Sequence, residues 1–331
     1  MSRRSFLLAA GALPALATLA AAESARAEGN DLADDPNSLS GIASTSEVEP
    51  AAATIPHAPD GQYLNYATGR SDIGRGSNVT FDDAGVIMVR RGTGYVHNPV
   101  TISQYGLQQF SYWALRGETA ARHRAVLQAN WLLRNQDTRT GLWAYDYPFS
   151  VGAMSETLPA GWSSAMAQGQ AISLLSRIYS VFPAKGGYRT AAMRAKWPFR
   201  RNVENGGLTT TFQGMPHYEE YPTRSAPCLA LNGFQFTLVG LWDGAQNLGD
   251  SEAQKFFDEG WETMVATLPH YDAVTTTAYH LGHLTKPPRK IHHADHYHRV
   301  HVMLLEVLGR MRPDPVIDFY RELWSTYPPM G

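Results

Sequence analysis

The 331-residue sequence contains a single cysteine, Cys228. One cysteine cannot form an intramolecular disulfide, so the fold must be stabilised by packing rather than by a disulfide framework. Net charge is also small: 28 Lys and Arg against 30 Asp and Glu give −2 at pH 7. This balance offers no basic field for nucleic acid and no basic face for a membrane surface. We therefore expect neither kind of partner for the mature chain.

The motifs of several enzyme classes are missing as well. The sequence has no phosphate-binding loop, no GxGxxG after a strand and no GxSxG elbow, which argues against nucleotide chemistry and serine hydrolysis. It has no repeat of fixed period, which argues against a solenoid. Strands and helices do not alternate, so neither a Rossmann sheet nor a TIM barrel fits.

The N-terminus has the pattern of an export signal. Arg3 and Arg4 are followed by an interrupted apolar run and by small residues up to Ala27. This pattern predicts a twin-arginine-type signal peptide over residues 1–27 and a periplasmic or secreted protein, because a membrane anchor would need about 20 apolar residues. Residues 28–61 are polar and aperiodic and predict a flexible linker.

The remaining chain is predicted to be mainly α. Residues 62–100 contain two β-favouring runs around Asp-Asp-Ala-Gly, which predict a short β-hairpin segment. Apolar residues then recur at three and four positions, and the predicted helices cover residues 120–136, 163–182, 188–199, 228–245, 251–268, 296–311 and 315–327. Paired helices with long loops between the pairs favour an α/α toroid, an incomplete α/α barrel, as one catalytic domain over residues 101–331.

Three clusters hold the residues suited to acid–base chemistry: YEEYPT (218–223), AYHLGH (278–283) and YHRVH (297–301). On a helix, Tyr297 and His301 are four residues apart and share one face. A solvated acidic loop and ordinary hydrogen-bonding histidines are the alternative interpretation of the same clusters. The 8 Trp and 16 Tyr would suit a groove that stacks on sugar rings, although most aromatic side chains fill cores.

A metal site built on His296, His298 and His301 is disfavoured. On a helix, residues 296 and 298 point in different directions, and no flanking Asp or Cys pattern completes the ligand set. We therefore expect no metal and no cofactor. A glutamate and a tyrosine can instead move a proton at a carbon next to a carboxylate, one group removing it and the other returning it on the opposite face. The ordinary tyrosine pKa near 10 makes its hydroxyl a good proton donor to a carbanion.

Longer strings resemble the D-glucuronyl C5-epimerases, which convert D-glucuronate units of heparosan-like chains to L-iduronate. The matching strings are GWSSAMAQGQAISLLSRIY (161–179), YEEYPT with LNGFQFTLVGLWD (231–243), LPHYD (268–272) and YHRVH. The match runs in order from about residue 98 to residue 324. The resemblance implies an α/α-barrel catalytic domain, a carbanion at C5 of a uronate and a glucuronate-containing polysaccharide as substrate.

Positions that match the motifs of this family indicate which residues would act at C5. The resemblance implies Glu220, Tyr221, Tyr297 and Tyr279 as catalytic residues. The candidate substrate-binding residues are Tyr105, Gln168, Asn232, Arg224, Arg299, His298 and His301.

Two departures from the family leave alternatives open. Gly282 stands where the family has an arginine next to the uronate carboxylate, so Arg224, Lys290 or Arg299 would have to supply that charge. A large β-domain present in eukaryotic members is missing between Leu107 and Arg122, which puts heparan sulfate itself in doubt. A polysaccharide lyase that uses the same proton abstraction and a non-catalytic glycan-binding protein remain alternatives. A homodimer also stays open.

Overall fold

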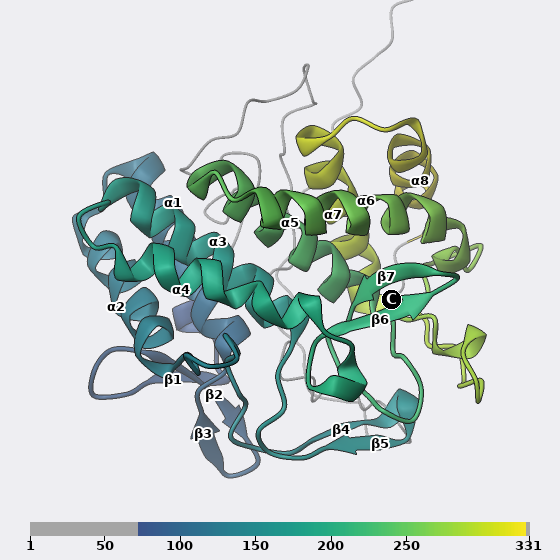
Figure 1. Cartoon of the computed structure of the whole chain (residues 1–331), viewed down its shortest axis with the longest axis horizontal. Coiled ribbons are helices and arrows are strands. Elements are labelled where there is room, and N and C mark those ends of the chain that lie inside the picture. Colours follow the sequence, from purple (N-terminus) through teal and green to yellow (C-terminus); the bar gives the residue numbers. More distant parts are fainter. Residues whose placement is uncertain (1–71, 329–331) are drawn as a thin grey trace, which may run out of the picture.

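The computed structural model describes residues 72–328, apart from the side chains of Asp295 and His296. The predicted signal peptide, the predicted linker and the start of the predicted hairpin segment lie outside the described residues. The α-helices of the described part are α1 (Pro99–Arg116), α2 (Thr119–Asn135), α3 (Ala165–Val181), α4 (Gly187–Ala195), α5 (Leu231–Leu248), α6 (Ser251–Tyr271), α7 (Asp295–Met311) and α8 (Pro315–Ser325) (Figure 1).

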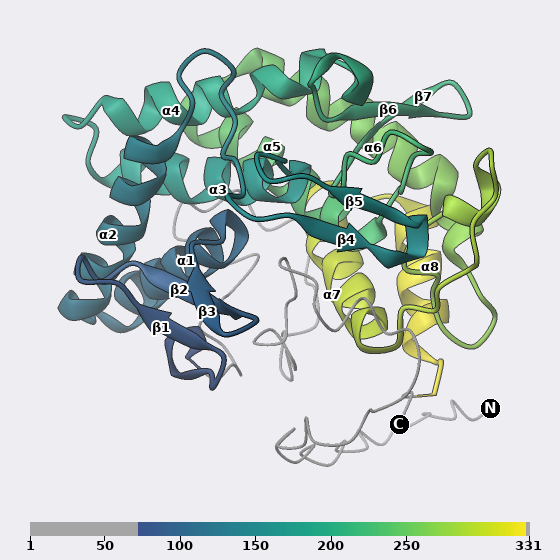
Figure 2. The same cartoon turned by 90° about the horizontal axis from the view of Figure 1, so that it is seen from below.

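The helices are arranged as consecutive packed pairs. Helix α1 packs against α2, α3 against α4, α5 against α6 and α7 against α8. The first members of the pairs also pack in a row, α1 on α3, α3 on α5 and α5 on α7. Figure 2 shows that the pairs follow one another along an arc. The mainly α fold predicted from the sequence is confirmed, with the row of paired helices expected of an incomplete α/α toroid.

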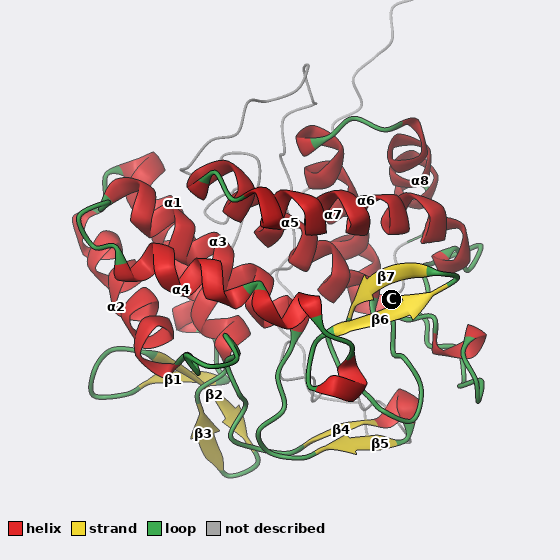
Figure 3. Cartoon of the chain, viewed as in Figure 1, coloured by secondary structure: helices red, strands yellow, loops and turns green. Residues whose placement is uncertain are grey.

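Three small antiparallel sheets accompany the helices (Figure 3). Their strands are β1 (Val79–Phe81), β2 (Ile87–Arg91) and β3 (Gly94–Val96), then β4 (Phe149–Val151) with β5 (Glu156–Leu158), and β6 (Thr209–Phe212) with β7 (Met215–Tyr218). Strands β1 and β2 form the hairpin around Asp82, whose side chain accepts hydrogen bonds from the amides of Ala84 and Val86 at 2.9 and 2.8 Å. The third strand β3 and the two later hairpins were not predicted from the sequence.

Helix α1 is a further element that the sequence pattern did not reveal as a helix. Its ends carry clear signals: the Asn98 side chain accepts from the amide of Thr101, Pro99 is the first helical residue, and Gly117 ends the helix with φ 69°. Its interior is buried on almost every side, including Gln104 and Gln108. Burial of polar residues leaves no contrast between an apolar and a polar face, so the 3.6-residue period is weak.

Helices α3 and α5 approach each other closely because both carry glycine at the crossing. A Cβ atom at Gly240 would overlap the main-chain carbonyl of Gly169, and a Cβ at Gly169 would lie 2.6 Å from the Cα of Thr237. A buried ion pair joins the same two helices, since Arg177 Nη2 lies 2.7 Å from Asp243 Oδ2. Within residues 72–328, the helices include none with the length and hydropathy of a membrane span.

Candidate active site

The first turns of α3, α5 and α7 converge on one region. The amide of Ala165, the first residue of α3, donates to the carbonyl oxygen of Glu219 at 2.9 Å. Gly233 in the first turn of α5 contacts Glu220, and Tyr297 lies in the first turn of α7. Helix N-termini carry partial positive charge, so this end of the helical array favours an anionic group.

The hairpin β6–β7, which precedes Glu220 in the chain, holds this residue at the N-terminus of α5. Strand β7 ends at Tyr218, and the amide of Glu219 continues the pairing by donating to the carbonyl of Leu208 at 2.7 Å. The Glu220 carboxylate packs directly on Gly233, because any Cβ there would overlap its Oε2. Glycine is therefore required beside the carboxylate, and the positive end of the α5 dipole stabilises negative charge on it.

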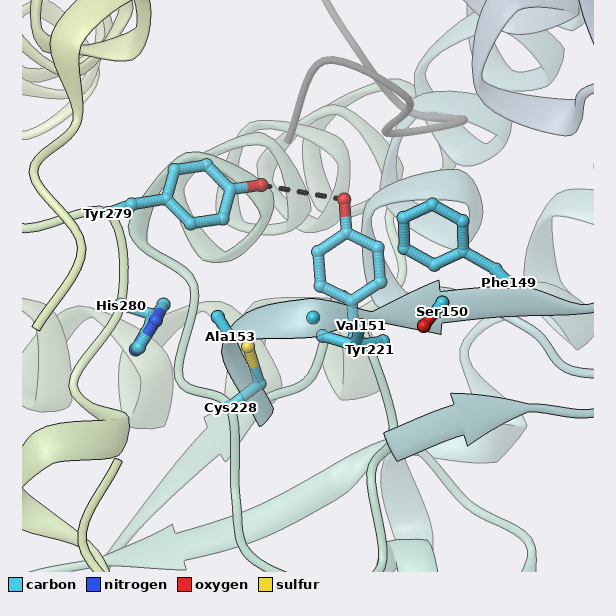
Figure 4. Close-up of a pocket in the computed structure, with 9 residues that line it drawn as sticks. Phe149, Ser150, Val151, Ala153, Tyr221, Cys228, Tyr279 and His280 are labelled. Carbon is cyan, nitrogen blue, oxygen red and sulfur yellow. Dashed lines mark hydrogen bonds between the residues drawn. The ribbon is translucent and has the colours of Figure 1, made fainter. Parts of the chain in front are cut away.

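One tyrosine contacts this carboxylate, and two more contact that tyrosine. The Tyr279 hydroxyl donates to Glu220 Oε2 at 3.4 Å and lies 3.4 Å from the Tyr221 hydroxyl. Figure 4 shows these two hydroxyl groups pointing toward each other. The Tyr297 ring packs edge-on against the Tyr279 ring, with centroids 4.9 Å apart. The structure thus brings together Glu220, Tyr221, Tyr279 and Tyr297, which were the four predicted catalytic residues.

Tyr279 reaches the cluster from an extended segment fixed by main-chain hydrogen bonds. Its amide donates to the carbonyl of His292 at 2.8 Å, and its carbonyl accepts from the amide of Leu231 at 3.0 Å. The second bond ties the segment to the first residue of α5. Tyr279 and Glu220 are therefore held by the same helix end, which fixes their separation.

The neighbouring Glu219 lies outside this cluster. Its Oε2 accepts from the amide of Leu229 at 3.0 Å, and the residue is completely buried. Burial raises the pKa of the Glu219 carboxyl to about 8. The group therefore stays protonated at neutral pH, and its contacts are those of a structural residue.

Aromatic side chains extend the site away from Tyr221. The Phe149 ring stacks on Tyr221 with centroids 5.4 Å apart, and Tyr145 stacks on Trp162 at 3.9 Å. Trp162 also stacks on Phe149 at 5.7 Å, which joins the two pairs. With Tyr147, which meets Tyr145 edge-on at 5.7 Å, these rings form an aromatic array. The alternating string WAYDYPF (143–149) is the sequence signal that could have located it.

A small pocket lies beside the two facing hydroxyls. It is lined by Phe149, Ser150, Val151, Gly152, Ala153, Tyr221, Cys228, Tyr279 and His280 (Figure 4). His280 Nδ1 accepts from the amide of Gly282 at 2.9 Å, which places the ring proton on Nε2. Burial lowers the pKa of His280 to about 3, so its ring is neutral. His280 is a pocket residue that was not among the predicted site residues.

A longer side chain at the position of Gly282 would require neighbouring side chains to shift. A Cβ there would lie 2.9 Å from Met154 Sδ and 3.0 Å from His280 Nδ1. The structure therefore gives a packing reason for the missing arginine at this position.

The histidines of α7 are occupied by a hydrogen-bond chain with Thr277. His298 Nε2 lies 3.0 Å from the carbonyl oxygen of Trp324, so it carries the proton and His298 Nδ1 accepts from the Thr277 hydroxyl at 3.2 Å. The same hydroxyl oxygen then accepts from His301 Nδ1 at 2.7 Å. Burial lowers the pKa of both rings. Their contacts tie α7 to the Thr277 segment and to α8 rather than to Glu220.

Two predicted substrate-binding residues have other contacts. Gln168 Nε2 donates to the carbonyls of Gly141 and Ala195 at 2.9 and 2.7 Å, and its Oε1 accepts from the amide of Trp143 at 3.2 Å. Tyr105 packs on Phe81, with ring centroids 5.4 Å apart, and burial raises its pKa to about 12. The structure does not bring either residue to the Glu220 cluster.

Of the last three predicted substrate-binding residues, one is buried near Glu220 and two are exposed. Asn232 is completely buried in the first turn of α5, next to Gly233, and its side-chain amide has no hydrogen-bond partner within residues 72–328. Arg224 is exposed, and its main-chain amide donates to Glu156 Oε1 at 2.8 Å. Arg299 is exposed on α7. Of these three, Asn232 has the burial and position of a ligand-binding residue.

A metal has no evident place among these residues. Within residues 72–328, excluding the side chains of Asp295 and His296, no group of three His, Cys, Asp or Glu side chains has the geometry to hold a metal ion. His296, one of the three histidines considered for a metal, lies outside the side chains that the structure describes.

The helical array and its buried carboxylate–tyrosine cluster define an acid–base enzyme of the toroid type. The sequence model of the family "D-glucuronyl C5-epimerase C-terminus" matches residues 136–326, more than half of the chain. The protein belongs to this family.

The chain is also similar to individual proteins of known sequence or structure. The chain is 33% identical over 217 residues to a D-glucuronyl C5-epimerase of Caenorhabditis elegans, which covers 62% of this chain and 35% of that protein. It therefore spans about a third of that relative. The structure also has a likeness, at 14% identity and a TM-score of 0.46, to unsaturated glucuronyl hydrolase from Bacillus sp. GL1, over 68% of this chain and 60% of that one.

Proposed function

We propose that the protein is an exported epimerase that inverts C5 of D-glucuronate units in a polysaccharide to give L-iduronate. The observation that carries the proposal is the contact of the Glu220 carboxylate with the Tyr279 hydroxyl at 3.4 Å, with Tyr221 and Tyr297 adjoining it. This cluster contains a base and hydroxyl acids within one buried region. Family membership supports the same reaction.

The chemistry follows from the charges of these groups. Glu220 removes the C5 proton, and the electron pair left on C5 is delocalised into the adjacent carboxylate as an enediolate. The Tyr297 hydroxyl then delivers a proton to the opposite face of C5, which inverts the centre, and solvent exchange restores both groups. Two groups on opposite faces are needed because one group alone would return the proton to its original face.

Tyr279 and Tyr221 position this base. The Tyr279 hydroxyl has one proton, which it donates to Glu220. The Tyr279 oxygen therefore accepts a hydrogen bond from the Tyr221 hydroxyl, and the two hydroxyls form a chain directed toward the carboxylate. The array of Phe149, Trp162 and Tyr145 is buried and supports Tyr221, on which Phe149 stacks. The buried amide of Asn232 would donate to or accept from a sugar hydroxyl.

The test is incubation of the purified protein with unsulfated heparosan in deuterated water, followed by proton NMR. Loss of the C5 proton signal together with new iduronate signals supports epimerisation. A product that absorbs in the near ultraviolet, as a 4,5-unsaturated uronate does, would instead identify a lyase that expels the C4 substituent. Tight binding without any exchange would identify a glycan-binding protein.

Export is a separate part of the proposal and is supported by the sequence of residues 1–27. Expression of the full chain in a bacterium with a twin-arginine pathway should place the protein in the periplasm. Replacing Arg3 and Arg4 by lysine should retain it in the cytoplasm. Equal periplasmic amounts for both forms would contradict the assignment of this export route.

A further inference from the structure

The reaction needs a positive charge that the Glu220 cluster itself does not contain. Removal of the C5 proton adds one negative charge to a group that is already a carboxylate, so the enediolate needs cations or hydrogen-bond donors. Arg224 and Arg299 are exposed, and Lys290 is exposed as well. These were the cations expected from the sequence.

Arg91, the last residue of β2, lies over the aromatic array instead. Its Cζ is 5.0 Å from the ring centroid of Tyr147 and 5.4 Å from that of Phe149. Phe149 stacks in turn on Tyr221, whose hydroxyl meets Tyr279. One aromatic ring, that of Phe149, therefore lies between the guanidinium and the tyrosine cluster.

The first turn of α1 supports the same face of the array. Asn98, which caps α1, donates from Nδ2 to the Tyr147 hydroxyl at 3.4 Å. Tyr147 is thus fixed between the end of α1 and the Arg91 guanidinium. Arg91 itself is half-buried and anchored by the main-chain pairing of β2 with β3, where it lies opposite Gly94.

We propose that the Arg91 guanidinium binds a uronate carboxylate of the substrate chain. This rests on the proposed function in taking a uronate polymer as the ligand. A guanidinium presents two parallel N–H donors to a carboxylate, and its other face can remain stacked on Tyr147 and Phe149. The N-terminal sheet, which precedes the residues matched by the epimerase family, would then complete the site.

The neighbouring Arg90 provides a matched control. It lies in the same strand, is exposed, and points to the other side, where its Nη2 donates to the Tyr95 hydroxyl at 3.0 Å. Arg91→Ala and Arg90→Ala remove the same charge from adjacent positions. Long-range effects of net charge are therefore equal in the two variants, and a difference between them reports the position of Arg91.

The first experiment measures the dissociation constant of a heparosan oligosaccharide for the wild-type protein and both variants. Arg91→Ala should weaken binding about 10- to 100-fold, the usual loss for a hydrogen-bonded charge, whereas Arg90→Ala should remain within about twofold. With a carboxyl-reduced oligosaccharide, Arg91→Ala should bind as well as wild type. Equal affinities for the two variants, or the same Arg91→Ala loss with the reduced chain, would overturn the proposal.

A second variant, Arg91→Gln, keeps much of the stacking surface and covers the case in which Arg91→Ala does not fold. Steady-state kinetics of C5 exchange then show whether Arg91 binds the carboxylate of the reacting sugar or that of a neighbouring sugar. A fall in kcat would assign Arg91 to the reacting sugar, and a rise in KM at constant kcat would assign it to a neighbouring sugar. If the wild-type protein exchanges no C5 hydrogen, the proposed function fails, while the binding comparison still decides the role of Arg91.

Discussion

Glu219 and Glu220 are adjacent in the chain, but their carboxyl groups have different partners. Glu219 Oε2 accepts from the amide of Leu229 at 3.0 Å, whereas Glu220 Oε2 accepts from the Tyr279 hydroxyl at 3.4 Å. Neighbouring side chains of an extended segment point to opposite sides, which explains the division. One carboxyl is therefore available for proton transfer and the other supports the backbone.

Glu220→Gln should abolish epimerisation while Glu219→Gln retains most of it. The first change removes the base, and losing one acid–base group costs about 10² to 10⁴ in rate. The second replaces a carboxyl that burial keeps protonated, and the amide oxygen of glutamine can still accept from Leu229. The measurement is the iduronate-to-glucuronate ratio with heparosan. Similar losses in the two variants would show that the glutamates act as a unit and would contradict the separate roles.

Glu219 should also make the stability of the protein depend on pH. Its folded pKa of about 8 lies above the ordinary value of 4.5, so the folded state holds the proton more tightly than the unfolded state. Between these two values the unfolded chain ionises first, and the free energy of unfolding falls as pH rises. The loss is complete above about pH 8 and is on the order of 5 kcal/mol at most.

Urea unfolding at pH 5, 6.5 and 8 tests this, with Glu219→Gln as the control because glutamine does not titrate. The wild-type midpoint should fall relative to the variant as pH rises. Buried histidines also make stability depend on pH, because burial lowers the pKa of His217 and His280 to about 3, but they are common to both proteins and cancel in the difference. Parallel midpoint curves would mean that the buried carboxyl is not protonated in the folded state.

Gln168→Ala should lower stability without a specific effect on substrate affinity. The side chain bonds two carbonyl groups and one amide of surrounding loops, and its removal leaves these buried groups unpaired. An unpaired buried group costs about 1 to 3 kcal/mol, which for a chain of this size lowers the melting temperature by several degrees. Melting temperature and KM should be measured together. A raised KM at unchanged stability would return Gln168 to the substrate-binding set.

The sequence predicted most of the helices, including α3 and α5, which are buried on nearly every side. The apolar period is clear in α6 and α7, whereas α1 buries glutamines and serines on most sides and was missed. Hairpins β4–β5 and β6–β7 are three or four residues per strand, too short for an alternation to stand out. Short strands are specified by what they pack on, which a single sequence does not display.

The sequence located part of the candidate site. Glu220, Tyr221, Tyr279 and Tyr297 lie in compact strings that resemble a family, and the structure brings them together. His298, His301 and Gln168 have equally polar side chains, but their partners lie elsewhere in the chain. Gln168 and His298 bond the carbonyls of Ala195 and Trp324, and His301 bonds the Thr277 hydroxyl. Arg91 lies in a strand segment outside the resemblance, and only its packing on Tyr147 and Phe149 relates it to the site.

Chelation should leave activity unchanged. The Glu220 cluster can transfer a proton without a metal, and His298 and His301 hydrogen-bond to Thr277 and Trp324. The check is C5 exchange before and after dialysis against EDTA. Activity that is lost on dialysis and restored by zinc or calcium would require a metal-assisted mechanism, such as that of a metal-dependent lyase.

Tyr297→Phe should stop inversion while the protein stays folded. The ring packs on Tyr279 at 4.9 Å, and phenylalanine preserves that packing while it removes the hydroxyl that would return the proton. Tyr188→Phe is the control, since its hydroxyl bonds Asn130 between α2 and α4. The variant should lose about 10² to 10⁴ in epimerisation rate, and the control should match wild type.

The two-base mechanism makes a second, more specific prediction for Tyr297→Phe. If Glu220 still faces C5, it can remove the proton and return solvent deuterium to the same face without inversion. Tyr297→Phe should therefore incorporate deuterium into glucuronate slowly while forming no iduronate, and NMR of the recovered polymer distinguishes the two outcomes. Iduronate formed at the wild-type rate would remove Tyr297 from the reaction. Loss of exchange together with loss of inversion, in a folded variant, would favour a mechanism in which one concerted proton relay serves both faces.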